Sequence, residues 1–115
     1  MKTPYKIQWV YDAKLSIEDC FARLKDLPPT NPYICSKVFC TVVSNTKMEF
    51  VFTQAAGAGR FYRTTYIAEF YPIETGRTVI VMRFINELGI WLPPVITYEQ
   101  IDDFFANCIQ AYRRK

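Results

Sequence analysis

Four segments of the chain place apolar and polar side chains alternately, and short runs of turn-forming residues separate them. This period of two is typical of β-strands that have one better buried face. Connections as short as these favour hairpins between consecutive strands. The four segments span residues 37–44, 47–54, 60–71 and 77–86. The sequence therefore predicts an antiparallel β-meander as the centre of the fold.

One further strand and two amphipathic helices flank this meander. The alternation of residues 5–12 predicts the first strand, with Trp9 and Tyr11 on its buried face. A helix follows, because Ser16 can cap it and the apolar residues after Ser16 share one stripe. The last helix is expected to begin after a Thr97 cap and to keep the helical period as far as Tyr112. The predicted fold class is α+β, in the order β-α-β-β-β-β-α, with both helices on one face of the sheet in a two-layer single domain, residues 1–115.

Closing the three hairpins gives an expected register and sorts the side chains onto two faces. The expected facing pairs are Val43 with Met48, Phe52 with Tyr62, and Ala68 with Ile80. The core face then carries Phe39, Met48, Phe50, Phe52, Tyr62, Tyr66, Phe70, Ile80, Met82 and Phe84. The other face carries Val38, Cys40, Val42, Glu49, Val51, Arg63, Thr65, Ile67, Glu69, Val79, Val81, Arg83 and Ile85.

This second face is unusually rich in valine and isoleucine for a solvated sheet surface. In the expected register Glu49, Thr65 and Arg83 form a row across three strands, with Arg63 diagonal to it. One interpretation is an exposed surface of β-branched residues with ordinary cross-strand ion pairs. The other is a dimer interface or a binding surface, in which the charges supply specificity. The expected interface residues are Val51, Arg63, Ile67, Val81 and Arg83.

The stretch GIWLPPV, residues 89–95, combines core-like side chains with two prolines that exclude regular structure. It can act as a plug that closes one end of the core, or as a lid over an apolar cavity between the last helix and the sheet. The expected walls of such a cavity are Tyr62, Tyr66, Trp91 and Phe105. The order of elements resembles a reduced helix-grip sheet of START-like lipid carriers, with fewer strands and one helix fewer, and also half of a PH-like barrel. No family motif is matched, so the resemblance is one of element order alone.

Several kinds of chemistry are disfavoured by the composition. The chain has no histidine, which removes the commonest general base and metal ligand. Its four cysteines form no CxxC pair and are expected to be free and mostly buried. Glu49 and Glu69 are expected to form structural ion pairs, and AAGAG is expected to be a hairpin loop. No catalytic residue, metal site or cofactor is predicted.

The partner classes follow from charge and hydropathy. The formal charge of +3 comes partly from residues 113–115, which are expected at the C-terminus of the last helix. Nucleic acid is therefore not the expected partner. No apolar stretch is as long as that of a signal peptide or a membrane span, which predicts a cytoplasmic protein. The sequence predicts a non-enzymatic domain that binds a protein partner or a second copy of itself on the valine-rich face. The alternative is a carrier of a small apolar ligand held between the last helix and the sheet.

Overall fold

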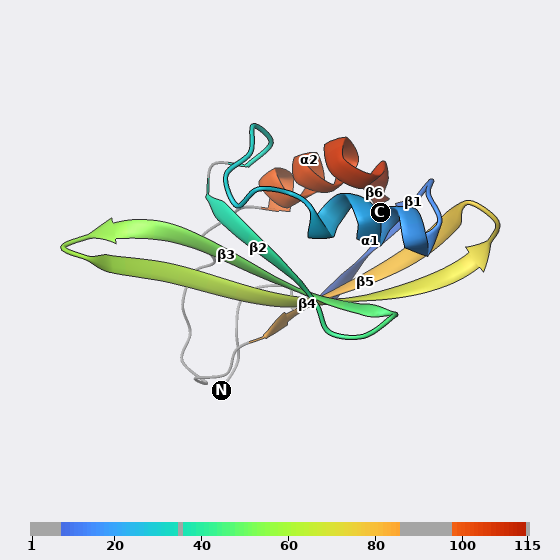
Figure 1. Ribbon diagram of the computed structural model, residues 1–115, viewed down its shortest axis with the longest axis horizontal. Coiled ribbons are helices and arrows are strands. Elements are labelled where there is room, and N and C mark those ends of the chain that lie inside the picture. The colour runs from blue at the N-terminus through green and yellow to red at the C-terminus, as the bar shows by residue number, and fades with distance from the viewer. Residues whose placement is uncertain (1–7, 35, 86–97, 115) are drawn as a thin grey trace.

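The computed structural model describes residues 8–34, 36–85 and 98–114, without the side chains at positions 56, 60 and 61. Over these residues the chain forms one antiparallel sheet of six strands and two helices (Figure 1). The strands are β1 (Gln8–Ala13), β2 (Lys37–Val42), β3 (Lys47–Gly57), β4 (Arg60–Glu74), β5 (Arg77–Ile85) and β6 (Ala111–Arg113), and the helices are α1 (Ile17–Lys25) and α2 (Tyr98–Ile109). The order of strands in the sheet is β2-β3-β4-β5-β1-β6.

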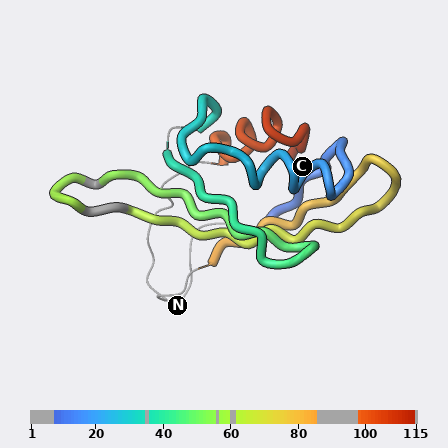
Figure 2. Tube along the Cα trace, viewed as in Figure 1, coloured from blue at the N-terminus to red at the C-terminus, as the bar shows by residue number. Residues whose placement is uncertain are grey.

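Both helices lie on the same side of the sheet, as Figure 1 shows. The predicted α+β class with an antiparallel meander is therefore confirmed. Helix α1 begins as expected: the Ser16 hydroxyl accepts a hydrogen bond of 3.1 Å from the Asp19 N–H, and Cys20 and Leu24 are buried. The tube in Figure 2 shows that the β3–β4 hairpin extends well beyond the helices. Neither described helix is long and apolar enough to cross a membrane.

The end of α2 differs from the prediction. The helix ends at Ile109, and Gln110 has a φ of 51°, in the left-handed region that breaks a right-handed helix. The chain then returns as β6, which pairs with β1 and places Ala111 opposite Ala13. The expectation that Tyr112 continues the helix is wrong, and so is the expected helical position of the terminal basic residues. The expected cap at Thr97 lies outside the described residues.

The register also differs, because the turns are tighter than the sequence suggested. In the β3–β4 hairpin Gly57 pairs with Arg60, and in the β4–β5 hairpin Glu74 pairs with Arg77, so each loop has two residues. The register of each hairpin therefore differs from the expected one by two residues. A shift by an even number leaves every side chain on its expected face of the sheet. The observed pairs are Phe52 with Thr64, and Ala68 with Met82.

The β2–β3 connection changes the faces of β2. Val43 and Ser44 both donate their N–H groups to the Lys47 carbonyl, which inserts one extra residue opposite Lys47. Val42 therefore pairs with Met48, in place of the expected Val43. Because a slip of one residue exchanges the two faces of a strand, every side chain of β2 points the other way.

The core face is corrected accordingly at two predicted positions. Phe39 is 44% exposed, and Val38 takes the buried place with 2% exposure. Tyr62 is 63% exposed; it pairs with Gln54 close to the turn of the β3–β4 hairpin. The other eight predicted members of the core face are buried or pack against the core: Met48, Phe50, Phe52, Tyr66, Phe70, Ile80, Met82 and Phe84.

Aromatic rings join α2 to the sheet. Phe105 lies 4.6 Å from Tyr11 and 5.4 Å from Phe50, measured between ring centroids. Phe104 lies 6.3 Å from Phe52 in an edge-to-face arrangement. Such pairs contribute about 0.5–1.5 kcal/mol each beyond the burial of their area. The helical layer is therefore fixed to β1 and β3, and the opposite face of the sheet is left without a described helix.

Candidate functional site

The face of the sheet that points away from α1 and α2 is here called the open face. Cross-strand pairing arranges its residues in rows, and three of the rows carry most of its apolar and charged side chains. The first row is Lys47, Glu69, Val81 and Val10; the second is Thr41, Glu49, Ile67, Arg83 and Gln8; the third is Phe39, Val51, Thr65 and Ile85.

All five predicted interface residues lie on the open face. Val51, Ile67 and Val81 are half-buried by their neighbours in the sheet, whereas Arg63 and Arg83 are exposed. Ile67 pairs directly with Arg83, and Val81 pairs with Glu69. Four of the five therefore lie within three consecutive rows, and Arg63 lies farther along β4, opposite Thr53. The structure brings this predicted set together on one surface.

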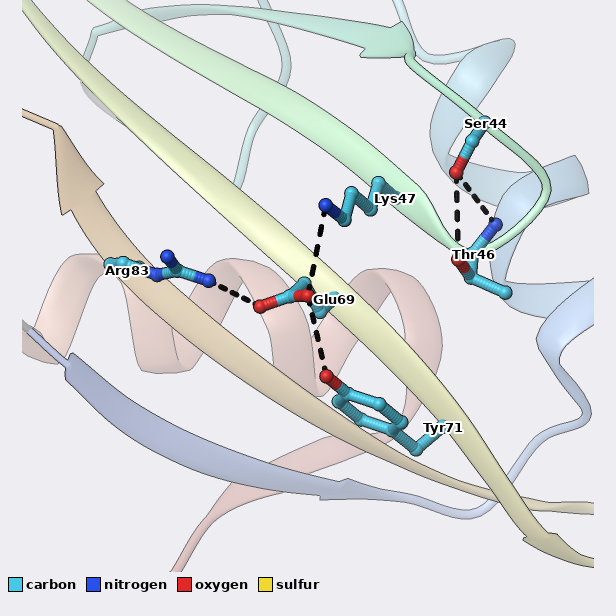
Figure 3. Close-up of polar contacts among 6 residues, drawn as sticks. All are labelled: Ser44, Thr46, Lys47, Glu69, Tyr71 and Arg83. Carbon is cyan, nitrogen blue, oxygen red and sulfur yellow. Dashed lines mark hydrogen bonds and ion pairs between the residues drawn. The ribbon is translucent and has the colours of Figure 1, made fainter.

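A charged cluster around Glu69 occupies part of this surface (Figure 3). Its carboxylate forms an ion pair with Arg83 and lies 3.9 Å from the Lys47 ammonium. The Tyr71 hydroxyl donates a third contact to the same carboxylate, at 3.3 Å. Because Glu69 is held by residues of β3, β4 and β5, the cluster fixes the positions of charges across three strands.

Glu49 has a different position from the predicted one. Its row contains Ile67 between Glu49 and Arg83, and Thr65 lies in the next row. Glu49 is half-buried, and no cation of the described residues forms an ion pair with it. Adjacent strands lie about 4.8 Å apart, so Arg83, two strands away, is about 10 Å from Glu49 along the sheet. The Glu49 carboxylate therefore lies on the open face beside apolar side chains, and none of the described residues forms an ion pair with it.

The predicted ligand-binding residues are not gathered around one space. Tyr66 and Phe105 are buried members of the core, where Tyr66 contacts the rings of Trp9 and Phe52. Tyr62, close to the turn of the β3–β4 hairpin, is exposed. Trp91, together with the whole of GIWLPPV, lies outside the described residues. Of the three described members of this set, Tyr66 and Phe105 are buried in the core and Tyr62 is not.

The described cysteines are free, as expected: Cys20 and Cys108 are buried and Cys40 is half-buried. Burial raises the pKa of Cys20 to about 11, of Cys108 to about 11 and of Cys40 to about 12. Thiols with such pKa values hold little thiolate at neutral pH and are poor nucleophiles. Cys35 lies outside the described residues. In the described ranges, no three His, Cys, Asp or Glu residues form a group that could hold a metal ion.

A surface hollow of about 490 Å³ lies between the start of α1 and the β4–β5 turn. It is lined by Ser16, Ile17 and Glu18 together with residues 72–77. The Ser16 hydroxyl is already used to cap α1, and Arg77 is paired with Glu74 at 3.4 Å. The hollow is therefore large enough for a small molecule, but Ser16 and Arg77, which line it, already have hydrogen-bond or ion-pair partners within the chain.

Sequence reasoning missed the central role of Glu69, because the register decides which charges are neighbours. It also missed the pairing of Tyr11 with Asp102, since no local pattern relates residues so far apart in the chain. Comparisons with protein-family models, with curated proteins and with solved structures gave no match for this chain.

Proposed function

We propose that the protein acts by binding another protein through the open face. The observation that carries this proposal is the combination, in adjacent rows, of half-buried aliphatic residues with a carboxylate that has no ion-pair partner among the described residues. No described helix or strand covers this face (Figure 1). Binding would bury the aliphatic rows and supply a cation to Glu49.

The chemistry of the face fits a protein partner. Interfaces between proteins combine an apolar centre with arginine and a polar rim. Val51, Ile67 and Val81 form the centre here, with Arg83 beside them and Arg63 at one end. Nucleic acid is a poorer fit, because Glu49 and Glu69 lie within the same rows and would repel phosphate groups.

The carrier alternative has weaker support. Tyr66 and Phe105, two of the four residues expected to line a cavity, are in contact with other rings of the core. Tyr62 points into solvent, with 63% of its surface exposed. These positions favour a protein-binding surface over a ligand held between α2 and the sheet.

The proposal is tested by the size of the complexes that the chain forms in an extract of the cells that naturally produce it. We expect the tagged wild-type chain to elute from a sizing column above the 13.5 kDa of the chain alone. The double variant Ile67→Lys, Val81→Lys is expected to elute at a smaller size, because two buried ammonium groups would oppose binding.

The control is Val43→Lys, which introduces one such ammonium group at a residue of the β2–β3 connection that is 57% exposed. We expect it to elute like the wild type. Circular dichroism establishes that all variants are folded. If the folded double variant elutes as the wild type does, the open face is not the binding surface. Release of a small apolar molecule from that unchanged species on denaturation would favour the carrier function.

A further inference from the structure

Glu49 and Arg83 carry opposite charges and lie in the same row of the open face, on the two strands that flank β4. We propose that the partner is a second copy of this chain, packed face to face about a two-fold axis that runs along β4. In this arrangement Glu49 of each copy lies opposite Arg83 of the other copy. The inference rests on the proposed function, since it names the protein that the open face binds.

The geometry follows from the order of the strands. β3 and β5 flank β4, each about 4.8 Å from it. Rotation by 180° about an axis along β4 places β3 of one copy over β5 of the other and keeps the rows in step. Glu49 on β3 and Arg83 on β5 belong to the same row, with Ile67 of β4 between them. The rotation therefore creates two Glu49–Arg83 contacts, with Ile67 packed against Ile67 between them.

The neighbouring rows are compatible with the same axis. In the next row Val51 lies opposite Ile85, and Thr65 lies opposite itself. In the row on the other side, the Lys47 stem lies opposite Val81.

Two positions bring identical charges together across the axis. Glu69 would approach its own equivalent, but its charge is already compensated by Lys47 and Arg83 within each copy. Arg63 would also face itself, at the exposed end of the surface, where solvent screens the repulsion.

The charges also select this axis over the other symmetric arrangement. A two-fold axis perpendicular to the strands and passing through Ile67 would keep each strand over its own equivalent. Glu49 would then lie opposite Glu49, and no cation of the described residues forms an ion pair with Glu49 in either copy. Like charges in direct opposition cost several kcal/mol at an interface, so the axis along β4 is preferred. Both axes keep the strands of the two sheets nearly aligned, which is the common way for sheets to pack, so the charges decide between them.

The size of the surface indicates the strength of the dimer. From β2 to β1, the strands that overlap about an axis along β4, the open face is about 19 Å wide, and from Arg63 to Tyr71 it is about 27 Å long, at the usual strand spacing and rise per residue. Each copy therefore contributes about 500 Å², which gives a total of about 1,000 Å², at the lower limit of specific interfaces. We expect a dimer with a dissociation constant in the micromolar range.

The test is sedimentation of the purified protein over a range of concentrations. The wild type should dimerise, and Glu49→Arg or Arg83→Glu alone should weaken the dimer at least about tenfold, because each places two like-charge pairs across the axis. An equimolar mixture of the two single variants should form a heterodimer. In it, the arginine introduced at position 49 of one variant meets the glutamate introduced at position 83 of the other, and the unchanged Arg83 meets the unchanged Glu49. The double variant Glu49→Arg, Arg83→Glu should dimerise by itself.

A second complementary pair leaves the Glu69 ion pairs intact, in case Arg83→Glu fails to fold. Ile67→Arg and Ile67→Glu should each be monomeric, whereas their mixture should dimerise, because this residue meets its own equivalent on the axis. The matched control is the exchange Glu74→Arg, Arg77→Glu, which alters an ion pair at the β4–β5 turn and should leave dimerisation unchanged.

Failure of this inference is distinguishable from failure of the proposed function. A wild type that stays monomeric at all concentrations overturns the second copy as partner, and so does a dimer that none of the mixtures restores. If the complex in the cell extract still depends on Ile67 and Val81, the open face binds a different protein. If that complex is also insensitive to both residues, the proposed function is wrong as well.

Discussion

The Tyr11 hydroxyl of β1 donates a hydrogen bond of 2.7 Å to the Asp102 carboxylate of α2. Arg113 of β6 donates its Nε–H to the other oxygen of the same carboxylate, at 3.0 Å. One side chain of α2 therefore connects the helix to two strands of the sheet. Burial raises the pKa of Tyr11 above its usual value, and the hydrogen bond to Asp102 raises it further.

Removal of this hydroxyl should destabilise the fold. Tyr11→Phe keeps the ring contact with Phe105 and leaves Asp102 with Arg113 alone, so we expect a loss of about 1–2 kcal/mol in the free energy of unfolding. Urea denaturation measures the change. Tyr112→Phe serves as the control, because Tyr112 is exposed and its ring, which Lys14 approaches, is retained. Equal effects of the two variants would show that the contact with Asp102 adds nothing.

The facing of β2 is tested by two neighbouring residues. Val38→Ala should cost about 1–2 kcal/mol, because Val38 is buried, whereas Phe39→Ala should cost less than about 1 kcal/mol at its exposed position. Thermal or chemical unfolding of the two variants measures the difference. The faces expected from the sequence alone require the opposite order, so a larger loss for Phe39→Ala would contradict the observed register of β2.

The left-handed conformation of Gln110 predicts that glycine stabilises this position. Gln110→Gly should raise the free energy of unfolding by about 0.5–1 kcal/mol, because glycine adopts a positive φ without steric cost, although it adds entropy to the unfolded chain. Gln54→Gly is the matched control: Gln54 lies in the extended strand β3, where glycine should destabilise by about 0.5 kcal/mol or more. The same sign for both substitutions would refute the role of the backbone angle.

The buried thiols predict a loss of stability at alkaline pH. Burial raises the pKa of Cys20 from 9.0 in the unfolded chain to about 11, so its contribution is complete below pH 9 and is lost as the pH rises to 11. We expect Cys20→Ala to be less stable than the wild type at pH 7 by about 1 kcal/mol, because a small cavity remains. The two free energies of unfolding should converge between pH 9 and 11. Parallel curves over that interval would exclude the thiol as the titrating group.

The fold was predictable from the sequence where neighbouring residues determine it. The Ser16 cap, the stripe of α1 and the four alternating strands of the meander depend on local patterns, and the structure contains all of them. β6 was not predictable in the same way. It has only three residues, and Gln110 gives no sign of a left-handed conformation, since glycine is the usual residue at such a position.

The site was harder to predict, because the register depends on details of the turns. Asn45 and Thr46 suggested a loop of two residues, but Ser44 accepts a hydrogen bond from the Thr46 N–H and the connection takes one residue more. The extra residue exchanged the two faces of β2. The residues of β3, β4 and β5 that lie on the open face were predicted correctly, because the registers of the two other hairpins differ from the expected ones by an even number of residues. The ion pairs differ from the expected ones, however, since Arg83 pairs with Glu69 and not with Glu49.

The position of β1 between β5 and β6 has a consequence for biosynthesis. The ribosome makes β1 before either of the strands that β1 pairs with, and the β6 pairing joins Tyr11 to Arg113. The consecutive hairpins β2 to β5 can assemble early, since each needs only its neighbour, whereas β1 has to wait for partners that emerge much later. During this delay Trp9 and Tyr11 have no sheet to cover them. Translation speed and chaperones are therefore expected to act on the yield of folded protein chiefly through this first strand.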